Sequence, residues 1–297
     1  MGYLYLLCVA VMFSFGGTCA KLINPWFSPE YITFFRFFIG ILFLLLLKLM
    51  KRQKFRPDFH AMLKLLPGWL FFGAICKWLA YLTENYGFAY GPSYGNIVIQ
   101  PAQAVFITLA SVFVFHEKLS YKKVLCIIMC TAGVLCISWN GRSLNEFFQK
   151  SIFLTLLFVV SGIFGGCHVL AQKMVADKMD IIDSNLTMFS ISALFAVCPL
   201  IPETVGGAIT GIRPDFSCIL AILAFGFITG IGFYLNAKAI PLVPLYMVPI
   251  IQSTMVIFAI LWGALFFHEK ITGYIIGGTI VFLAGLIFLQ LLNAADT

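Results

Sequence analysis

Apolar stretches of about 20 residues follow one another along the whole chain, separated by short segments that contain polar residues, Pro and Gly. A water-soluble core does not need this much apolar sequence. Lipid offers no hydrogen bonds to the backbone, so such a chain crosses a bilayer as helices that satisfy their own backbone groups. The alternation of apolar and polar residues that is typical of a membrane β-barrel does not occur. The pattern predicts an all-α polytopic membrane protein.

The breaks between the apolar stretches predict ten transmembrane helices. We place them at residues 3–22, 31–50, 64–88, 92–114, 124–140, 151–171, 184–202, 217–237, 244–266 and 272–292. The longest basic connection, KLMKRQKFRPDFHAMLK, joins the second and third helices, and no connection is long enough to hold a soluble domain.

Two segments of the chain share a pattern of identical residues at a separation of 152 positions. The tetrad Phe-His-Glu-Lys occurs at 115–118 and again at 267–270. The same shift places these further residues on identical ones: Pro92, Tyr94, Ile99, Gln100, Phe106 and Leu109. At a slightly different offset, FSFGG at 13–17 matches GIFGG at 162–166. We therefore expect two copies of one five-helix unit, residues 1–145 and 146–297.

An odd number of helices in each unit means that the second unit enters the membrane from the opposite side. This is an inverted-topology repeat, an architecture of many secondary transporters. Two similar halves of opposite orientation can exchange conformations, which opens a site near the bilayer midplane first to one side and then to the other.

This organisation resembles the EamA-type members of the drug/metabolite transporter superfamily over the whole chain. The resemblance rests on the five-plus-five helices and on the end of each half, where a helix, a Glu-Lys turn and a glycine-containing last helix follow one another. These segments read NIVIQPAQAVFITLASVFVFHEKLSYKKVLCIIMCTAGVLCI and VPIIQSTMVIFAILWGALFFHEKITGYIIGGTIVFLAGLIFL. The stretch YLTENYGFAYGPSYGNIV also resembles the junction between the third and fourth helices of the family. The resemblance implies transport of a small molecule, often export, and does not specify the molecule.

Charge is scarce, at 10% of residues against about 25% in soluble domains. The net charge of +7 is better explained by basic loops than by nucleic-acid binding, so we expect no nucleic-acid partner. Most Lys and Arg residues lie in the connections on the side of the N-terminus, and the positive-inside rule then predicts cytoplasmic N- and C-termini. We expect a multi-pass protein of the plasma membrane.

Motifs for bound cofactors or enzymatic chemistry are missing from the sequence. The nine Cys residues lie almost wholly within apolar stretches without a CxxC pair, which is typical of small packing residues. No HExxH, G-x-S-x-G or Walker sequence occurs. We expect no metal, no cofactor and no enzymatic activity, with a membrane channel or an intramembrane enzyme as the alternative functions.

Polar residues that occur in only one half are the leading candidates for a substrate site, because a single substrate has no two-fold symmetry. Lys77, Tyr81 and Glu84 follow an i, i+4, i+7 pattern on one helix face, and Trp78 begins an adjacent stripe. A Lys at the helix centre costs about 2.5–3.5 kcal/mol on an insertion scale, so Lys77 needs a cavity or a partner. We expect Lys77 to attract a carboxylate or another anionic group, or else to snorkel or form a structural ion pair. Glu84 would neutralise Lys77, bind an amine or carry a coupling proton.

Two further ionisable residues lie within expected helices. Arg36 either pairs with Glu84, binds a substrate carboxylate bidentately or snorkels to the interface. His168 is either a proton carrier for coupling or a hydrogen-bonded structural histidine.

Amide and aromatic side chains complete the predicted substrate site. Gln100 and Gln252 are equivalent in the two halves, and they either fix helix packing or line the cavity from both sides. Tyr94, Tyr246 and Trp262 are candidates for stacking on an aromatic or cationic substrate, although such residues also pack or anchor membrane helices.

Proline and glycine positions predict how the helices bend and pack. Pro101 and Pro249 are expected to bend or break the fourth and ninth helices. Small residues four apart predict close helix packing at three pairs: Gly162 and Gly166, Gly226 and Gly230, and Gly273 and Gly277.

The repeated tetrad is predicted to stabilise a turn. Its His and Lys complement the negative end of the preceding helix. Ser120 and Thr272 follow two residues later, where each can cap the next helix. The inversion places the turn at 116–118 in the cytoplasm and the turn at 268–270 outside.

The sequence therefore predicts a secondary transporter of a small polar or amphipathic metabolite, an amino acid-like one first, that exports it by alternating access. Its expected partners are the small-molecule substrate, a coupling proton or exchange solute and the lipid bilayer. The expected assembly is a monomer or a homodimer.

Overall fold

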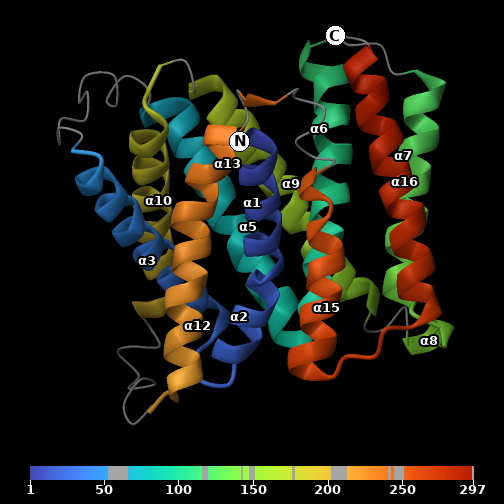
Figure 1. The fold of residues 1–297 in the computed structure, drawn as a ribbon, viewed down its shortest axis with the longest axis horizontal. Coiled ribbons are helices and arrows are strands. Elements are labelled where there is room, and N and C mark those ends of the chain that lie inside the picture. The colour runs from blue at the N-terminus through green and yellow to red at the C-terminus, as the bar shows by residue number, and fades with distance from the viewer. Residues whose placement is uncertain are drawn as a thin grey trace.

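The described chain is helical throughout (Figure 1). The structure, a computed structural model, describes residues 1–52, 66–115, 120–141, 143–146, 151–175, 178–201, 213–239, 242–243 and 251–295. Its elements are α1 (Gly2–Ser14), α2 (Gly16–Ile23), α3 (Pro29–Met50), η1 (Leu66–Leu70), α5 (Phe71–Tyr90), η2 (Ser93–Val98), α6 (Ile99–Phe115), α7 (Tyr121–Trp139), α8 (Leu144–Glu146), α9 (Ile152–Val175), α10 (Ile181–Val197), α12 (Phe216–Phe227), η4 (Ile228–Gly232), α13 (Phe233–Ala239), α15 (Met255–Phe267) and α16 (Gly273–Ala295).

Six segments of the described chain are long and apolar enough to cross a membrane. They are Gly2–Ile23, Pro29–Met50, Tyr121–Trp139, Ile152–Val175, Phe216–Ala239 and Gly273–Leu292. Two further apolar helices, α10 and α15, are shorter. The prediction of an all-α membrane protein is confirmed, while the count of ten spans stays a prediction.

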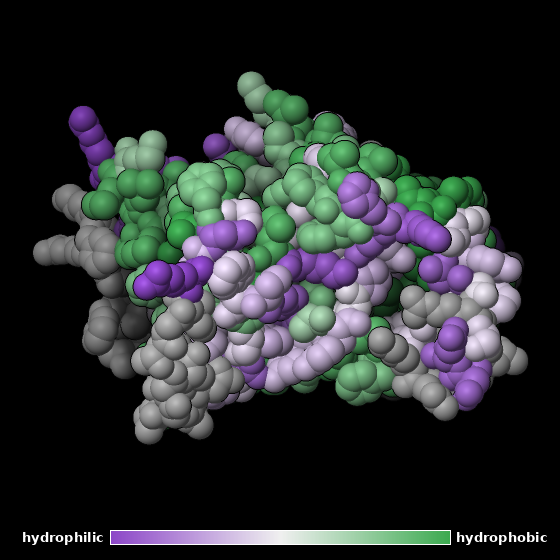
Figure 2. Space-filling model, turned by 90° about the horizontal axis from the view of Figure 1, so that it is seen from below, coloured by the Kyte–Doolittle hydropathy of each residue, from purple (hydrophilic) through white to green (hydrophobic). Residues whose placement is uncertain are grey.

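The helices lie side by side and share two ends (Figure 1). We call the end at which α1 begins and α16 finishes the upper end, and the opposite end the lower end. Seen from below, hydrophilic residues gather across the middle of the lower end, and hydrophobic residues occupy much of its margin (Figure 2). A polar end cap with an apolar margin is the surface expected where a helical bundle leaves the hydrocarbon core.

Irregular turns interrupt two of the helical segments. The π-type turn η4 separates α12 from α13, and the 3₁₀ segment η2 precedes α6. Pro101 lies in the first turn of α6, where a missing N–H breaks no intrahelical bond. The predicted fourth helix, residues 92–114, thus changes from a 3₁₀ segment to an α-helix just before Pro101, which agrees with the expected break. Pro249 lies outside the described residues.

The last helices of the two predicted units, α7 and α16, pack antiparallel with local two-fold symmetry. Cys130 Sγ lies 3.9 Å from the carbonyl oxygen of Phe282, the residue 152 positions later. A Cβ added to Gly133 would lie 2.7 Å from the oxygen of Gly278, and one added to Gly285 would lie 3.0 Å from the oxygen of Cys126. These two contacts are equivalent under the shift of 152 residues, because Gly133 corresponds to Gly285 and Cys126 corresponds to Gly278. The interface is thus self-complementary, with its axis near Cys130 and Phe282.

The predicted glycine pairs divide into two that pack closely and one that does not. Gly162 faces Ala102 on α6, and Gly230 faces the backbone of Gly40 on α3. A Cβ added to Gly273 or Gly277 would have nothing within 4 Å in the described chain, so their predicted packing role is wrong. The close contacts of α16 come from Gly278 and Gly285, because these residues share the face that meets α7.

Candidate functional site

Three ionisable side chains from two helices meet inside the bundle. Arg36 of α3 and Lys77 of α5 are each 6% exposed, and Glu84 of α5 is 7% exposed. Thr229 of η4, which is fully buried, completes the group from the second half. We call these four residues the central cluster.

Close helix packing positions the central cluster. A Cβ on Gly230 would lie 2.6 Å from the oxygen of Gly40, so α3 and η4 approach backbone to backbone. That approach brings Thr229 to Arg36, which stands one helical turn before Gly40. On α5, the i, i+4, i+7 spacing places Lys77 and Glu84 on the face that meets α3.

Arg36 has two hydrogen-bond partners and two aromatic neighbours. Its Nη1 donates to Glu84 Oε2 at 2.7 Å, and its Nε donates to Thr229 Oγ1 at 3.1 Å. The guanidinium carbon lies 3.3 Å from the ring centroid of Tyr81 and 4.1 Å from that of Phe225. The predicted alternative in which Arg36 pairs with Glu84 is confirmed.

Lys77 lies beside this pair but has a different environment. Its Nζ is 4.1 Å from the ring centroid of Tyr81 and 4.0 Å from that of Phe233. Such cation–π contacts contribute up to about 2 kcal/mol when desolvated. The salt bridges among the described residues are Arg36–Glu84, Lys21–Glu269 and Lys48–Asp183, so no described carboxylate pairs with Lys77.

His168 is fully buried and connects α9 to α5. Its Nδ1 lies 2.9 Å from the carbonyl oxygen of Gly73, so Nδ1 carries the proton and donates it. Its ring stands edge-on to Phe233, with centroids 6.2 Å apart. Within the described chain its Nε2 has no hydrogen-bond partner. This geometry matches the structural alternative for His168.

Two of the predicted aromatic residues contact neighbouring helices. Trp78 stacks on Phe195 of α10 at a centroid distance of 5.6 Å. Trp262 of α15 donates from Nε1 to Ser14 Oγ at 2.9 Å and meets the ring of Phe15 edge-on. Trp262 therefore joins α15 to α1.

The two predicted glutamines have different surroundings. Gln252 donates from Nε2 to Asn236 Oδ1 at 2.6 Å. Asn236 is the residue that the shift of 152 pairs with Glu84. Gln100 is half-buried in the first turn of α6.

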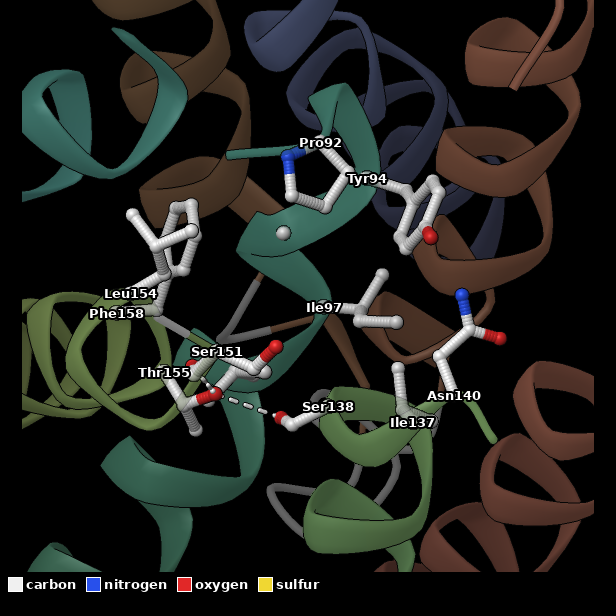
Figure 3. A pocket seen from close by; sticks show the side chains of 12 residues that line it. Pro92, Tyr94, Ile97, Ile137, Ser138, Asn140, Ser151, Leu154, Thr155 and Phe158 are labelled. Carbon is white, nitrogen blue, oxygen red and sulfur yellow. Dashed lines mark hydrogen bonds between the residues drawn. The ribbon is translucent and has the colours of Figure 1, made fainter. Parts of the chain in front are cut away.

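Tyr94 lines a separate cavity of about 50 Å³, between η2, the end of α7 and the start of α9 (Figure 3). Thr155 donates to Ser138 Oγ at 2.8 Å across one side of it. A space of this size holds a few water molecules rather than a metabolite. Tyr94 therefore lies away from the central cluster. Tyr246, its predicted equivalent in the second half, lies outside the described residues.

A second polar cluster lies at the lower end and was not predicted as a site. Glu269 accepts from Lys21 Nζ at 2.9 Å and from the backbone N–H and hydroxyl of Ser93 at 2.9 and 2.8 Å. A Cβ on Gly263 would lie 2.5 Å from Glu269 Oε2, and one on Gly17 would lie 1.9 Å from Ser93 O. We call Lys21, Ser93 and Glu269 the lower cluster. It joins α2, η2 and the turn after α15.

The turn of the second tetrad explains how Glu269 reaches these partners. His268 has a left-handed backbone, with φ of 52°, and the N–H of Glu269 bonds to Gly263 O at 3.2 Å. This bond, which follows a residue in the left-handed conformation, ties the turn back to the last turns of α15 and lets the chain reverse at the helix end. Thr272 accepts from the N–H of Ile275 in the first turn of α16, as its predicted capping role requires. Residues 116–118 of the first tetrad lie outside the described residues.

Comparison with known proteins identifies the same two-part organisation. The sequence profile of the EamA-like transporter family matches residues 1–139 and 151–291. None of the curated proteins matches the chain significantly. A solved crystal structure of a protein aligns with a TM-score of 0.68 at 14% identity, over 99% of this chain and 98% of that one. At this identity, the likeness concerns the fold alone.

Proposed function

Because the chain belongs to the EamA-like transporter family, whose members carry small molecules across membranes, we propose that it exports an amino acid-like metabolite by alternating access. The substrate is small, polar or amphipathic and carries a carboxylate. The transporter works in the lipid bilayer as a secondary carrier, without ATP.

The observation that carries the proposal is Lys77, a buried lysine whose Nζ lies between two aromatic rings with no carboxylate partner among the described residues. A cation in this position binds the substrate carboxylate, and the face of Tyr81 packs on the apolar part of the substrate. Arg36 and Glu84 form the adjoining wall of the site. Intramembrane ionisable residues of this kind mark substrate pathways in transporters.

The other predicted residues have supporting roles in this proposal. Trp78, Gln100 and Tyr94 line the path by which the substrate reaches or leaves the central cluster, and Tyr246 contributes from the second half. Gln252 and Trp262 are positioning residues. Gln252 donates a hydrogen bond to Asn236 within the second half, and Trp262 donates one from the second half to Ser14 of α1.

The proposed architecture is ten spans in two inverted halves, residues 1–145 and 146–297. The local two-fold symmetry between α7 and α16 supports it, because antiparallel equivalent helices are what an axis in the membrane plane generates. The proposed location is the plasma membrane, with both termini in the cytoplasm. One chain contains both halves, so a monomer suffices.

Glu84 is the proposed coupling residue. It lies on the helix that carries Lys77 and its carboxylate is held by Arg36, so a proton or the substrate amine binds at Glu84 while the substrate carboxylate binds at Lys77. His168 holds α9 against α5 in this scheme.

Uptake into everted membrane vesicles tests the proposal. Vesicles with the wild-type chain should accumulate at least one carboxylate-bearing compound from a panel of amino acids and related metabolites, above vesicles that lack it. Lys77→Met should remove this uptake, whereas Lys122→Met, at an exposed lysine of α7, should not. Equal uptake by the Lys77→Met and wild-type chains would reject the site. A steady single-channel current in a planar bilayer would reject alternating access.

A further inference from the structure

The central cluster holds two basic side chains, Arg36 and Lys77, and one carboxylate, Glu84. Arg36 and Glu84 neutralise each other at 2.7 Å, which leaves the ammonium of Lys77. Thr229, on the opposite side of Arg36, is uncharged, and His168 donates from Nδ1 to a carbonyl and bears no charge when Nε2 is bare. With Lys77 protonated, the sum over the cluster is +1.

Three described carboxylates elsewhere in the bundle are engaged with other groups. Asp183 pairs with Lys48, Glu269 pairs with Lys21, and Glu30 accepts from Tyr86. The aromatic faces beside Lys77 stabilise a cation but do not neutralise it. An unneutralised charge inside a bundle is expensive, so the missing negative charge is best supplied by what binds there.

We infer that the site selects substrates with a net charge of −1, such as an N-acylated or an acidic amino acid, over zwitterions. This inference rests on the proposed function and names its substrate class. A monoanion brings the occupied cluster to zero. A zwitterion supplies the same carboxylate but adds an ammonium, so the occupied cluster stays at +1.

Three compounds that share one side chain separate these cases. At about pH 6, below the ordinary pKa of an α-amino group, phenylalaninamide carries +1, phenylalanine is a zwitterion and N-acetylphenylalanine carries −1; leucine gives a second series. The readout is the melting temperature of the detergent-purified protein, because a ligand of the folded state raises it. The acetylated compounds should give the largest rise and the amides the smallest, and Lys77→Met should abolish the rise while Lys77→Arg keeps it.

An equal or larger rise with the zwitterions, or no rise with any of the six compounds, would overturn the inference. The melting assay does not depend on transport. Vesicles that transport a neutral amino acid would therefore support the proposed function while contradicting the charge preference.

A second inference comes independently from the lower cluster. Glu269 accepts three hydrogen bonds from residues of α2 and η2. Because Gly17 and Gly263 lack a Cβ, the backbone and the side chain of Ser93 can pack closely against them. The contact joins the predicted first and fourth helices, both from one half, to the turn after the predicted ninth helix, from the other half. Alternating access requires a contact between halves at one end of the bundle that separates when that end opens.

We propose that Lys21, Ser93 and Glu269 form the closing contact of the lower end. The contact is polar and small, so it can break and re-form in water, whereas the glycine-packed interface between α7 and α16 stays closed throughout the cycle. The tetrad thus supplies a gate residue as well as a turn.

The native Cys19, fully buried on α2 two residues before Lys21, reports on this gate. In a chain whose other cysteines are replaced, a membrane-impermeant maleimide added to the lower side should alkylate Cys19 slowly. Glu269→Ala should accelerate the reaction about tenfold or more, and Glu269→Gln, which keeps one acceptor oxygen, should have a smaller effect.

The neighbouring exposed Lys270→Ala is the matched control and should leave the rate unchanged. Melting temperatures of all variants show whether acceleration reflects opening or loss of the fold. Equal alkylation rates in Glu269→Ala, Glu269→Gln and wild type, or acceleration that follows a lowered melting temperature, would overturn the gate.

Discussion

Arg36 donates to Glu84 at 2.7 Å across the interface between α3 and α5, with both side chains less than one-tenth exposed. Both side chains are shielded from water, so each charge needs the other as its counter-ion. Removal of one partner from such a pair costs about 3–5 kcal/mol, whereas replacement of both by apolar groups is often neutral. The pair therefore holds two helices together and leaves Lys77 as the charge available to a ligand.

The first prediction follows from this dependence. Arg36→Met should lower the stability of the protein by about 3–5 kcal/mol, because it leaves the Glu84 carboxylate buried without a counter-ion. Arg36→Met combined with Glu84→Met should be markedly more stable than Arg36→Met alone. Thermal melts of the three purified variants in detergent measure the difference. A double variant that is the least stable of the three would show that the pair is not coupled in this way.

The second prediction concerns the interface of α7 and α16. Gly278→Leu should separate these helices and lower the melting temperature strongly, because even a Cβ there would lie 2.8 Å from Gly133 O. Gly277→Leu is the matched control on the adjacent residue, where nothing described lies within 4 Å. Similar melting temperatures for the two variants would contradict this packing of α7 on α16.

The third prediction separates the two roles of His168. His168→Phe removes the hydrogen bond to Gly73 O and should reduce stability by about 0.5–1.5 kcal/mol. Transport per folded molecule should keep its dependence on a proton gradient, because the coupling residue in this scheme is Glu84. A variant that melts normally but transports independently of the gradient would return the coupling role to His168.

The fourth prediction concerns orientation. Lys270 lies in the turn after α15 at the lower end, and Ala295 ends α16 at the upper end (Figure 1). In a cysteine-free chain, an impermeant maleimide should label Lys270→Cys in intact cells and label Ala295→Cys only after permeabilisation. The reverse pattern would invert the assigned topology, and labelling of both from outside would contradict the placement of the two ends.

The sequence alone predicted a large part of the fold, for a physical reason. Apolar stretches of membrane length specify helices almost directly, and a shift of 152 residues was enough to predict that α7 and α16 are equivalent. Their contact at Cys130 and Phe282 was not predictable, because it depends on which helix faces meet. The packing of Gly278 rather than Gly277 depends on the same choice.

The site was predictable only in part. Helical spacing places Lys77, Tyr81 and Glu84 on one face, and this needs no tertiary information. Residue types alone offer no reason to prefer Lys77 or Arg36 as the partner of Glu84, since both are cations. In the structure, Arg36 is the partner of Glu84. The close approach of α3 to η4 favours this pairing, because it lets Arg36 donate a hydrogen bond to Thr229 as well.

The lower cluster was missed because its members are far apart in the chain. Glu269 is 176 residues from Ser93 and 248 from Lys21. The repeated tetrad indicated a turn at each copy, and nothing in its local pattern shows what the Glu side chain meets. The closely spaced glycines beside Lys21 were the available signal for a tight contact.

The central claim is that Lys77 binds the substrate in a carrier that alternates between two faces. Counterflow in proteoliposomes tests it most directly, with N-acetylphenylalanine loaded inside and the labelled compound added outside. Wild-type protein should show uptake that requires the internal load, and Lys77→Met should lose at least about nine-tenths of it while Lys122→Met loses none. Counterflow that survives Lys77→Met at the wild-type rate, or uptake that ignores the internal load, would contradict the account.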